Sequence, residues 1–528
     1  MFHIRMHPLV LTTILLLVQL SLFLFLSVRP NRIAPPDREY PPIGYGYYYV
    51  NVMRQAIDGA WDVRDPSSTR PVPRIHIFTF FTILGKLAKI TKTDPVLIYE
   101  LFHVGGGVVL FFISYWFICI LLPKSYHFFA VLLVLGYELI PVNNIGFPFT
   151  AHSLIARHFG LPHHVWGEVF GLLSFGYLYI LCKKISVAGV IMLFILGIIA
   201  TQMLPSYMFS VGIPVFVTIF IYTIFTKGIK NALIPMVALG LSMLIMGISL
   251  HVESQKGIPF SNLVSEEKSW ATNSGLIISY LTSCIVYIPF LIMLAVISVK
   301  KWRIWNSQIH LTILLCTAWI LFPLIGFQLS LQSWFPIANW RLVEGTHYVP
   351  LGILSAIGLV QFFSLISHPY WKRVVTMISL ISILLYSGCA LTIYTRKKMD
   401  LQNTFWSNIY PLKSTMRAIY FLNTLPKQSG IMVREYVGEI IPGFADVHVF
   451  IDGPIGYPDW PQRQWLSQQF FSGTLTDAAA LKLLKDNHID YVFDGQDEQA
   501  LTTTPKLYPS ILTPIFSTDS VVIFSYHK

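Results

Sequence analysis

The hydrophobic residues of this chain fall in long runs that are separated by short polar links. Many of the runs reach the length of about 20 residues that a helix needs to cross a bilayer. They begin near Pro8, Val96, Phe128, Val165, Val187, Phe209, Ala232, Leu276, Ile309, Val349 and Val374. The pattern therefore predicts an α-helical polytopic membrane protein with about 11 spans.

The composition agrees with this prediction. Hydrophobic residues make up 54% of the 528 residues and charged residues only 12%, which is more apolar surface than one soluble core can bury. The formal net charge of +11 comes from lysines and arginines clustered between the apolar runs. A nucleic-acid interface would instead be a basic stripe with interleaved aromatic residues. We therefore expect the membrane as a partner and no nucleic acid.

The charges in the short links predict the orientation of the chain. One set of alternate links carries most of the basic residues: Lys124, Lys183, Lys184, Lys227, Lys230, Lys300, Lys301, Arg303, Lys372 and Arg373. The other set carries only Arg157, Lys256, Lys268 and Arg341. Because basic links stay in the cytoplasm, the N-terminus is predicted to be cytoplasmic. An odd number of spans then places the C-terminal region outside.

Two exterior segments are too long to be simple connections. The first, residues 29–94, belongs to a predicted membrane domain of residues 1–395, and the second is the soluble tail of residues 396–528. In the first segment, 47–61 and 75–92 repeat apolar residues at helical spacing and are predicted to form helices on the membrane surface. The alternative for residues 75–90 is a marginal or re-entrant span, which would reverse every later link.

The tail has the pattern of a small α/β domain. Short β-branched runs at 431–433, 447–451, 489–493 and 521–525 predict strands, whereas 460–471 and 477–487 predict helices. All five cysteines lie in apolar runs and none lies in this tail. The sequence therefore supports neither a disulfide framework nor a Cys-x-x-Cys metal site.

The densest polar and aromatic cluster follows the first span. Its carboxyl groups, Asp37, Glu39 and Asp58, are candidate general bases that could deprotonate an acceptor hydroxyl. The candidate substrate-binding residues around them are Tyr45, Tyr48, Tyr49, Arg54 and Trp61, because aromatic rings stack on sugar rings. The alternative is that the acids are solvated loop charges and the aromatic residues form an ordinary interfacial belt.

Two further exterior segments carry candidate binding residues. Asn144 and His163 lie in a segment with several histidines, which has no metal-binding His-x-x-x-His spacing and no carboxylate. Arg341 and His347 precede the tenth span, where a guanidinium could hold a lipid-linked phosphate through paired hydrogen bonds. The alternative for Arg341 is a surface ion pair with Glu344. No metal site and no cofactor are predicted, and a divalent cation requirement has no support in the sequence.

Taken together, these features resemble the GT-C superfamily of membrane glycosyltransferases, which includes the protein O-mannosyltransferases and the aminoarabinose transferases. The local resemblance is to uncharacterised bacterial members with a "YLSxIRQGxxGxW" pattern. It rests on Tyr49-Val-Asn-Val-Met-Arg-Gln-Ala56 with Gly59-Ala-Trp61, on Phe147-Pro-Phe149, on Arg341 to Pro350 and on Gly453 to Trp460. This chain departs from the pattern at Tyr45 and Ile145, where those members have acids, and Asp37, Glu39 and Asp58 are the nearest substitutes.

The resemblance implies a glycosyltransferase of the bacterial inner or plasma membrane. It would move a hexosyl or pentosyl group from a polyprenyl-phosphate donor to a lipid, glycan or protein acceptor on the exterior face. Asp37 or Glu39 would be the base and Arg341 would hold the departing phosphate. Two alternatives stay open: a catalytically degenerate protein that binds lipid-linked sugars, and a transporter or flippase that uses intramembrane acids such as Glu138 and Glu168.

Overall fold

The computed structural model describes most of the chain. The described residues are 7–33, 37, 46–66, 68–76, 78–136, 161–257, 284–301, 307–329, 347–404, 411–451, 457, 459–502 and 507–526. They separate into two compact units. The first unit comprises residues 1–26, 102–250 and 267–399, and the second comprises residues 27–101, 251–266 and 400–528. The second unit thus combines the first long loop with the C-terminal region.

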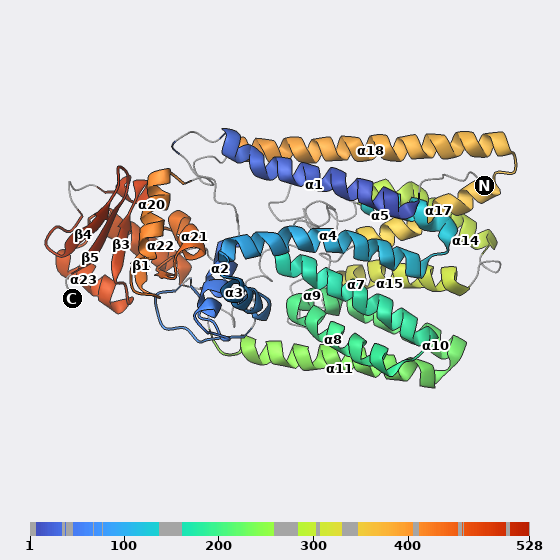
Figure 1. Ribbon diagram of the computed structural model, residues 1–528, viewed down its shortest axis with the longest axis horizontal. Helices are drawn as coiled ribbons and strands as arrows, with labels where there is room; N and C mark the ends of the chain where they lie inside the picture. Colours follow the sequence, from blue (N-terminus) through green and yellow to red (C-terminus); the bar gives the residue numbers. More distant parts are fainter. Residues whose placement is uncertain are drawn as a thin grey trace. The chain divides into compact units, whose positions relative to one another are not determined.

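The first unit is a bundle of apolar helices, which run side by side in Figure 1. Its helices are α1 (Pro8–Ile33), α4 (Pro95–Leu121), α5 (His127–Leu135), α7 (Pro162–Lys183), α8 (Val187–Met203), α9 (Pro205–Tyr207), α10 (Ile213–Lys227), α11 (Ile229–Ser254), α14 (Ile288–Lys301), α15 (Ser307–Gln328), α17 (Tyr348–Leu365) and α18 (Pro369–Thr404). Short 3₁₀ turns η2 (Lys124–Tyr126) and η5 (Ile285–Tyr287) precede α5 and α14, and a π-helical turn η4 (Met208–Gly212) joins α9 to α10.

Seven helices of the described residues are long and apolar enough to cross a membrane, namely Pro95–Leu121, Pro162–Lys183, Pro205–Lys227, Ile229–Ser254, Ser307–Gly326, Tyr348–Leu365 and Pro369–Ile393. Shorter apolar helices lie at Pro8–Leu22, Lys124–Leu135, Val187–Met203 and Ile285–Val299. Each predicted span therefore has an apolar helix at or near its expected start, apart from the start near Leu276, which lies outside the described residues. The multi-pass fold is confirmed.

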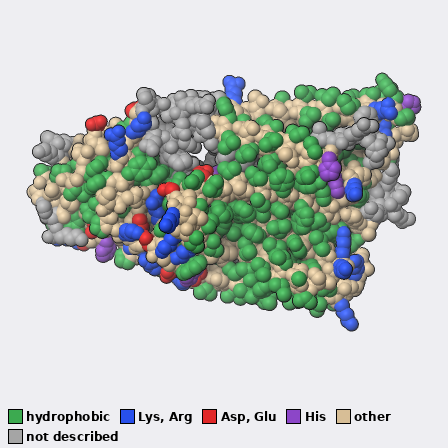
Figure 2. Space-filling view, viewed as in Figure 1, with side chains coloured by type: hydrophobic (Ala, Val, Ile, Leu, Met, Phe, Trp, Pro, Cys, Tyr) green, Lys and Arg blue, Asp and Glu red, His purple; other side chains and the backbone are tan. Residues whose placement is uncertain are grey.

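The surface of the bundle is that of a membrane protein. Large apolar side chains stand exposed on it, among them Phe225 (85%), Leu385 (65%) and Leu244 (58%). Figure 2 shows hydrophobic side chains covering much of the visible face of the bundle, with lysines and arginines gathered near the end of α10. Water would disfavour such a surface, whereas lipid does not. The chain is an integral multi-pass membrane protein.

The second unit is built on a five-stranded mixed sheet with the strand order β2-β1-β3-β5-β4. The strands are β1 (Gly430–Met432), β2 (His448–Val449), β3 (Tyr491–Asp494), β4 (Leu512–Ser517) and β5 (Val522–Tyr526). Strand β1 pairs in parallel with β2 and β3, while β5 pairs antiparallel with β3 and β4. The helices are α2 (Tyr47–Ile57), α3 (Thr79–Thr91), α20 (Lys413–Leu422), α21 (Glu435–Phe444), α22 (Trp460–Phe471), α23 (Asp477–Asp486) and α24 (Gln496–Gln499).

Most of the predicted α/β pattern is confirmed. Helix α22 has the predicted bounds and α23 ends one residue early. Both helices contribute to the same buried cluster, α22 through Phe470 and α23 through Leu484. Strand β4 was not predicted, since Pro514 interrupts its pattern, and neither was α21, whose sequence contains Gly438, Gly443 and Pro442. Helix α3 has 13 residues, which is short for the alternative span at 75–90.

Gly438 allows α21 to lie directly against the chain that follows β2. A Cβ atom at this position would stand 2.0 Å from the carbonyl oxygen of Ile451. Alanine is the better helix former, so close contacts alone oppose the change, chiefly this one and next the Cγ1 atom of Val433 at 3.3 Å. We expect Gly438→Ala to destabilise the protein by about 2 kcal/mol, measured as a lower melting temperature in lipid nanodiscs.

The matched control is Gly388→Ala in α18, where a Cβ atom meets nothing within 4 Å. Its melting temperature should equal or slightly exceed that of the native protein. Equal stability of the two variants would contradict the close approach of α21 to Ile451.

Candidate functional site

The first long loop is held against the C-terminal region by α2. This helix packs between α3 and α21 and buries two amides, Asn51 and Gln55. The Gln55 amide donates to Asn51 Oδ1 at 2.9 Å and to the carbonyl of Arg64 at 2.7 Å, and the Asn51 amide donates to the carbonyl of Ala445 at 3.4 Å. Because buried amides require partners, these bonds fix the rotation of α2 on α21.

Arg54 is turned toward the C-terminal region. Its Nε donates to the carbonyl of Gly443 at 3.3 Å. Burial lowers the pKa of the Arg54 guanidinium, and the nearby carboxylates of Asp94 and Asp446 oppose that shift. Arg54 remains a cation because the ordinary pKa of arginine is far above neutral.

Helix α2 ends in a turn that presents Asp58. Asp58 caps the helix, and Gly59 follows with φ +117°, a backbone conformation that favours glycine. The Asp58 carboxylate is paired with the ammonium group of Lys427, which comes from the connection between α20 and β1. The structure therefore joins Asp58, a candidate acid, to a cation of the C-terminal region.

Asp58 lies in a pocket of ≈ 230 Å³ within the second unit. The pocket is lined by Arg54, Ile57, Asp58, Leu422, Asn423, Leu425, Lys427 and Asp446. Burial, and next the neighbouring charge of Asp58, raise the pKa of Asp446, while Lys427 and Arg54 act in the opposite direction. The sequence prediction singled out Arg54 and Asp58 but none of the other pocket residues, since these lie far along the chain and carry no motif.

Asp37 is the described member of the Asp37 and Glu39 pair. It is exposed, it stands shortly after the end of α1, and its carbonyl accepts a hydrogen bond from the backbone N–H of Lys413 at 2.8 Å. Lys413 is the first residue of α20. This bond fixes the backbone of a candidate base beside α20.

The predicted aromatic residues take part mainly in packing. Tyr49 stacks on Phe81 with the ring centroids 4.3 Å apart, and Tyr48 meets Phe78 edge to face, which joins α2 to α3. Trp61 differs from them, because 57% of its surface is exposed and its ring lies 5.2 Å from the Lys86 ammonium group. An exposed indole ring can still stack on a sugar.

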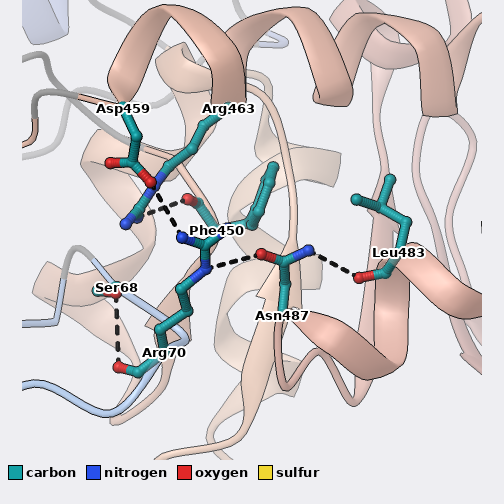
Figure 3. A network of polar contacts seen from close by, with 7 residues as sticks. All are labelled: Ser68, Arg70, Phe450, Asp459, Arg463, Leu483 and Asn487. Atoms are coloured by element: carbon teal, nitrogen blue, oxygen red, sulfur yellow. Dashed lines mark hydrogen bonds and ion pairs between the residues drawn. The ribbon is translucent and has the colours of Figure 1, made fainter.

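A second polar network, which the sequence did not indicate, binds Pro66 and Arg70 of the loop to the C-terminal region; Figure 3 shows its side-chain contacts. Arg70 donates to Asn487 Oδ1 at 2.9 Å and pairs with Asp459 at 3.1 Å. The same oxygen of Asp459 pairs with Arg463, whose Nη1 donates to the carbonyl of Phe450 at 3.4 Å. The Val449 N–H donates to the carbonyl of Pro66 at 3.0 Å, so the loop also covers the edge strand β2.

The remaining predicted site residues are divided between the first unit and the undescribed parts of the chain. His163 is half-buried in the first turn of α7, next to His164, and His347 is buried immediately before α17. Glu39, Tyr45, Asn144 and Arg341 lie outside the described residues, so their roles stay predictions. Among the described residues there is no group of three or more His, Cys, Asp or Glu side chains that could hold a metal ion.

No protein-family model matches the chain, and no curated protein matches it by sequence. Its fold is similar to that of the oligosaccharyltransferase of Archaeoglobus fulgidus tethered to an acceptor peptide (TM-score 0.50, 11% identity, 98% of this chain and 74% of that one). It is also similar to the oligosaccharyltransferase AglB of the same organism in complex with an inhibitory peptide and a dolichol-phosphate (TM-score 0.51, 13% identity, 91% and 69%).

ArnT from Cupriavidus metallidurans in the apo state also matches, with TM-score 0.49, 12% identity and coverage of 96% of this chain and 97% of that one. At such low identities the likeness concerns the fold. The similarity to the two oligosaccharyltransferase structures extends over nearly the whole chain. The chain therefore has the fold of these two oligosaccharyltransferase structures.

Proposed function

We propose that this protein is a membrane glycosyltransferase that moves a sugar from a polyprenyl-phosphate-linked donor to an acceptor on the exterior face of the membrane. The observation that carries the proposal is the fold likeness along nearly the whole chain to oligosaccharyltransferases, one of them in complex with a dolichol-phosphate and a peptide. Asp37 supports it as well, because this exposed acid follows α1 in the sequence and its backbone is bonded to Lys413 at the start of α20.

The proposed reaction is a displacement at the anomeric carbon. The carboxylate of Asp37, or of Glu39 beside it in the sequence, takes the proton of the acceptor hydroxyl as the acceptor oxygen bonds to the anomeric carbon. The bond from that carbon to the phosphate oxygen breaks, and the electron pair leaves with the polyprenyl phosphate. Attack from the face opposite the leaving group inverts the anomeric configuration, as the family resemblance implies.

Two further requirements of this reaction have candidate residues. The leaving phosphate gains negative charge, which the guanidinium of Arg341 would stabilise. The acceptor must be held against the donor at the membrane boundary, and such positioning contributes a large part of the rate of a two-substrate reaction. In this proposal the N-terminus is cytoplasmic and the second unit, which carries Asp37, is exterior.

The test is sugar transfer by the purified chain in liposomes. Polyprenyl-phosphate sugars with radiolabelled hexosyl or pentosyl groups are supplied with lipid, glycan and peptide acceptors, and labelled acceptor is separated from donor. We expect transfer from at least one donor and none in protein-free liposomes. Saturable donor binding without any turnover across the panel would contradict the proposal and favour a lipid-linked-sugar binding protein instead.

A further inference from the structure

The pocket around Asp58 is built from three separate segments of the second unit. The end of α2 contributes Asp58, the connection from α20 to β1 contributes Lys427, and Asp446 follows α21. Backbone bonds join these segments, because the Gln428 N–H donates to the carbonyl of Asp446 at 2.6 Å and Arg54 donates to Gly443. These two bonds link the three segments that line the pocket.

The pocket lining is balanced in charge. Two carboxylates, Asp58 and Asp446, face two cations, Arg54 and Lys427. A strongly anionic ligand would meet the carboxylates, and a metal cation would compete with the ammonium group of Lys427 that already pairs with Asp58. Transfer of an uncompensated charge into a half-buried site is costly. The lining therefore favours a neutral ligand.

The polar groups of the lining can both accept and donate hydrogen bonds. Oδ2 of Asp446 is buried and has no hydrogen-bond partner within the described part of the chain, so it can accept from a ligand hydroxyl. The N–H groups of Arg54 and Lys427 can donate to hydroxyl oxygens. Leu422, Leu425 and Ile57 complete the walls with aliphatic surface. A ligand with adjacent hydroxyl groups and an apolar C–H face fits this combination.

The size of the pocket restricts the ligand further. A volume of ≈ 230 Å³ is below the range of about 300–1,000 Å³ that holds drug-sized molecules. It suits one sugar ring. We propose that the pocket formed by α2, the α20–β1 connection and Asp446 binds one neutral monosaccharide unit.

The place of the pocket relative to Asp37 assigns this sugar to the acceptor. Asp37 is bonded to Lys413 at the start of α20, and Leu422 at its end lines the pocket. The helix has ten residues from end to end, a length of about 15 Å at the rise of an α-helix. The pocket thus lies too far along α20 to hold the reacting hydroxyl, and it suits a neighbouring unit of an acceptor glycan. The assignment of the sugar to the acceptor rests on the proposed transferase function, whereas the binding of a sugar by the pocket does not.

The test is binding of methyl glycosides to the full chain in lipid nanodiscs without glycosidic detergent. Methyl glucoside, mannoside, galactoside and arabinoside are compared with glucuronate and glucosamine by saturation-transfer NMR titration. We expect saturable binding of at least one neutral glycoside with a dissociation constant on the order of 1 mM, the strength expected of one small, shallowly held ring. Absence of binding by every neutral glycoside, or preference for a charged sugar, would overturn the proposal.

Two variants locate the binding. Asp446→Asn removes a charged acceptor and should weaken binding about tenfold, and Leu425→Trp should block the pocket without changing its charge. The matched control is Asp486→Asn, which breaks an exposed ion pair with Lys482 on α23. Unchanged melting temperatures show that the variants fold. Equal binding by all three variants would contradict the assigned pocket.

Transfer measurements separate this inference from the proposed function. If both hold, Asp446→Asn raises the KM for a glycan acceptor and leaves kcat unchanged. Glycoside binding at the pocket without transfer from any donor would contradict the transferase and retain the sugar site. Transfer with an unaltered acceptor KM in Asp446→Asn and Leu425→Trp would retain the transferase and overturn the acceptor subsite.

Discussion

The double variant Asp37→Asn/Glu39→Gln is expected to lose sugar transfer by at least about 100-fold, because general base catalysis contributes a factor of about 10²–10⁴. Both substitutions preserve side-chain size and remove only the proton acceptor. The Asp37 carbonyl that accepts from Lys413 belongs to the backbone and is retained. Transfer is measured in liposomes with the donor identified from the panel, and insertion of the variant is checked by its yield in the membrane fraction.

The matched control is Asp62→Asn in the same loop, where the hydrogen bond from Arg74 reaches the backbone carbonyl of Asp62 and not its carboxylate. It should transfer at the native rate. Retained transfer in the double variant would exclude Asp37 and Glu39 as the base. Asp58→Asn would then be the next variant, because Asp58 is the third candidate acid.

Arg341→Ala should lower kcat through the loss of phosphate stabilisation.

The second large effect concerns the dependence of stability on pH at Glu498. This carboxyl is fully buried in α24 and accepts hydrogen bonds from the backbone N–H groups of Arg434 at 2.9 Å and Gly495 at 3.1 Å. Burial raises its pKa from 4.5 to about 7, and these hydrogen bonds oppose the shift. The folded protein therefore binds the Glu498 proton more tightly than the unfolded chain does.

The sign of the effect follows from this raised pKa. The stabilisation is fully present below the unfolded pKa of 4.5 and is lost as the pH rises through about 7. The difference between the two pKa values corresponds to about 3 kcal/mol. The free energy of unfolding of the native protein, relative to that of Glu498→Gln, should thus fall by about 3 kcal/mol between pH 4.5 and pH 8. The measurement is the difference between the two melting temperatures at each pH.

The comparison with the variant is necessary because His448 acts in the opposite direction. Burial lowers the pKa of His448 from 6.5 to about 3, so its contribution is present above pH 6.5 and is lost as the pH falls. Asp494, with a pKa raised to about 6 by burial, acts in the same direction as Glu498. These two contributions are common to both proteins and cancel in the difference. A difference that does not change with pH would contradict the burial of an ionisable Glu498.

Features that depend on residues close together in the sequence could be predicted well. The span predicted to begin near Val96 follows from the length of one apolar run and is found at Pro95–Leu121, and α23 follows from the helical spacing of its apolar residues. Strand β4 could not be predicted in the same way. Its residues 512–517 include Pro514 and polar side chains, and they form a strand because β5 pairs with them across a bulge between Pro514 and Phe516.

The candidate site shows the same division. The cluster of acids and aromatic residues after the first span marked Asp37, Arg54, Asp58 and Trp61, because carboxylates can act as bases and aromatic rings can stack on sugars. No local pattern indicated that Arg54 would contact Gly443, 389 residues away, or that Arg70 would contact Asn487, 417 residues away. Such pairings arise only when α2 and the loop after it dock on the sheet.

The sequence by itself determined that the chain is a multi-pass membrane protein with an α/β C-terminal region. The length of a hydrophobic run and the period of its side chains are local properties, and they decide which side chains face lipid, the protein core or water. Only the tertiary structure decided that the first long loop and the C-terminal region form one unit, and that Asp58 and Asp446 share a pocket with Lys427. The physical reason is that these contacts join segments that are distant in the sequence, and the local pattern of each segment does not indicate which other segment it packs against.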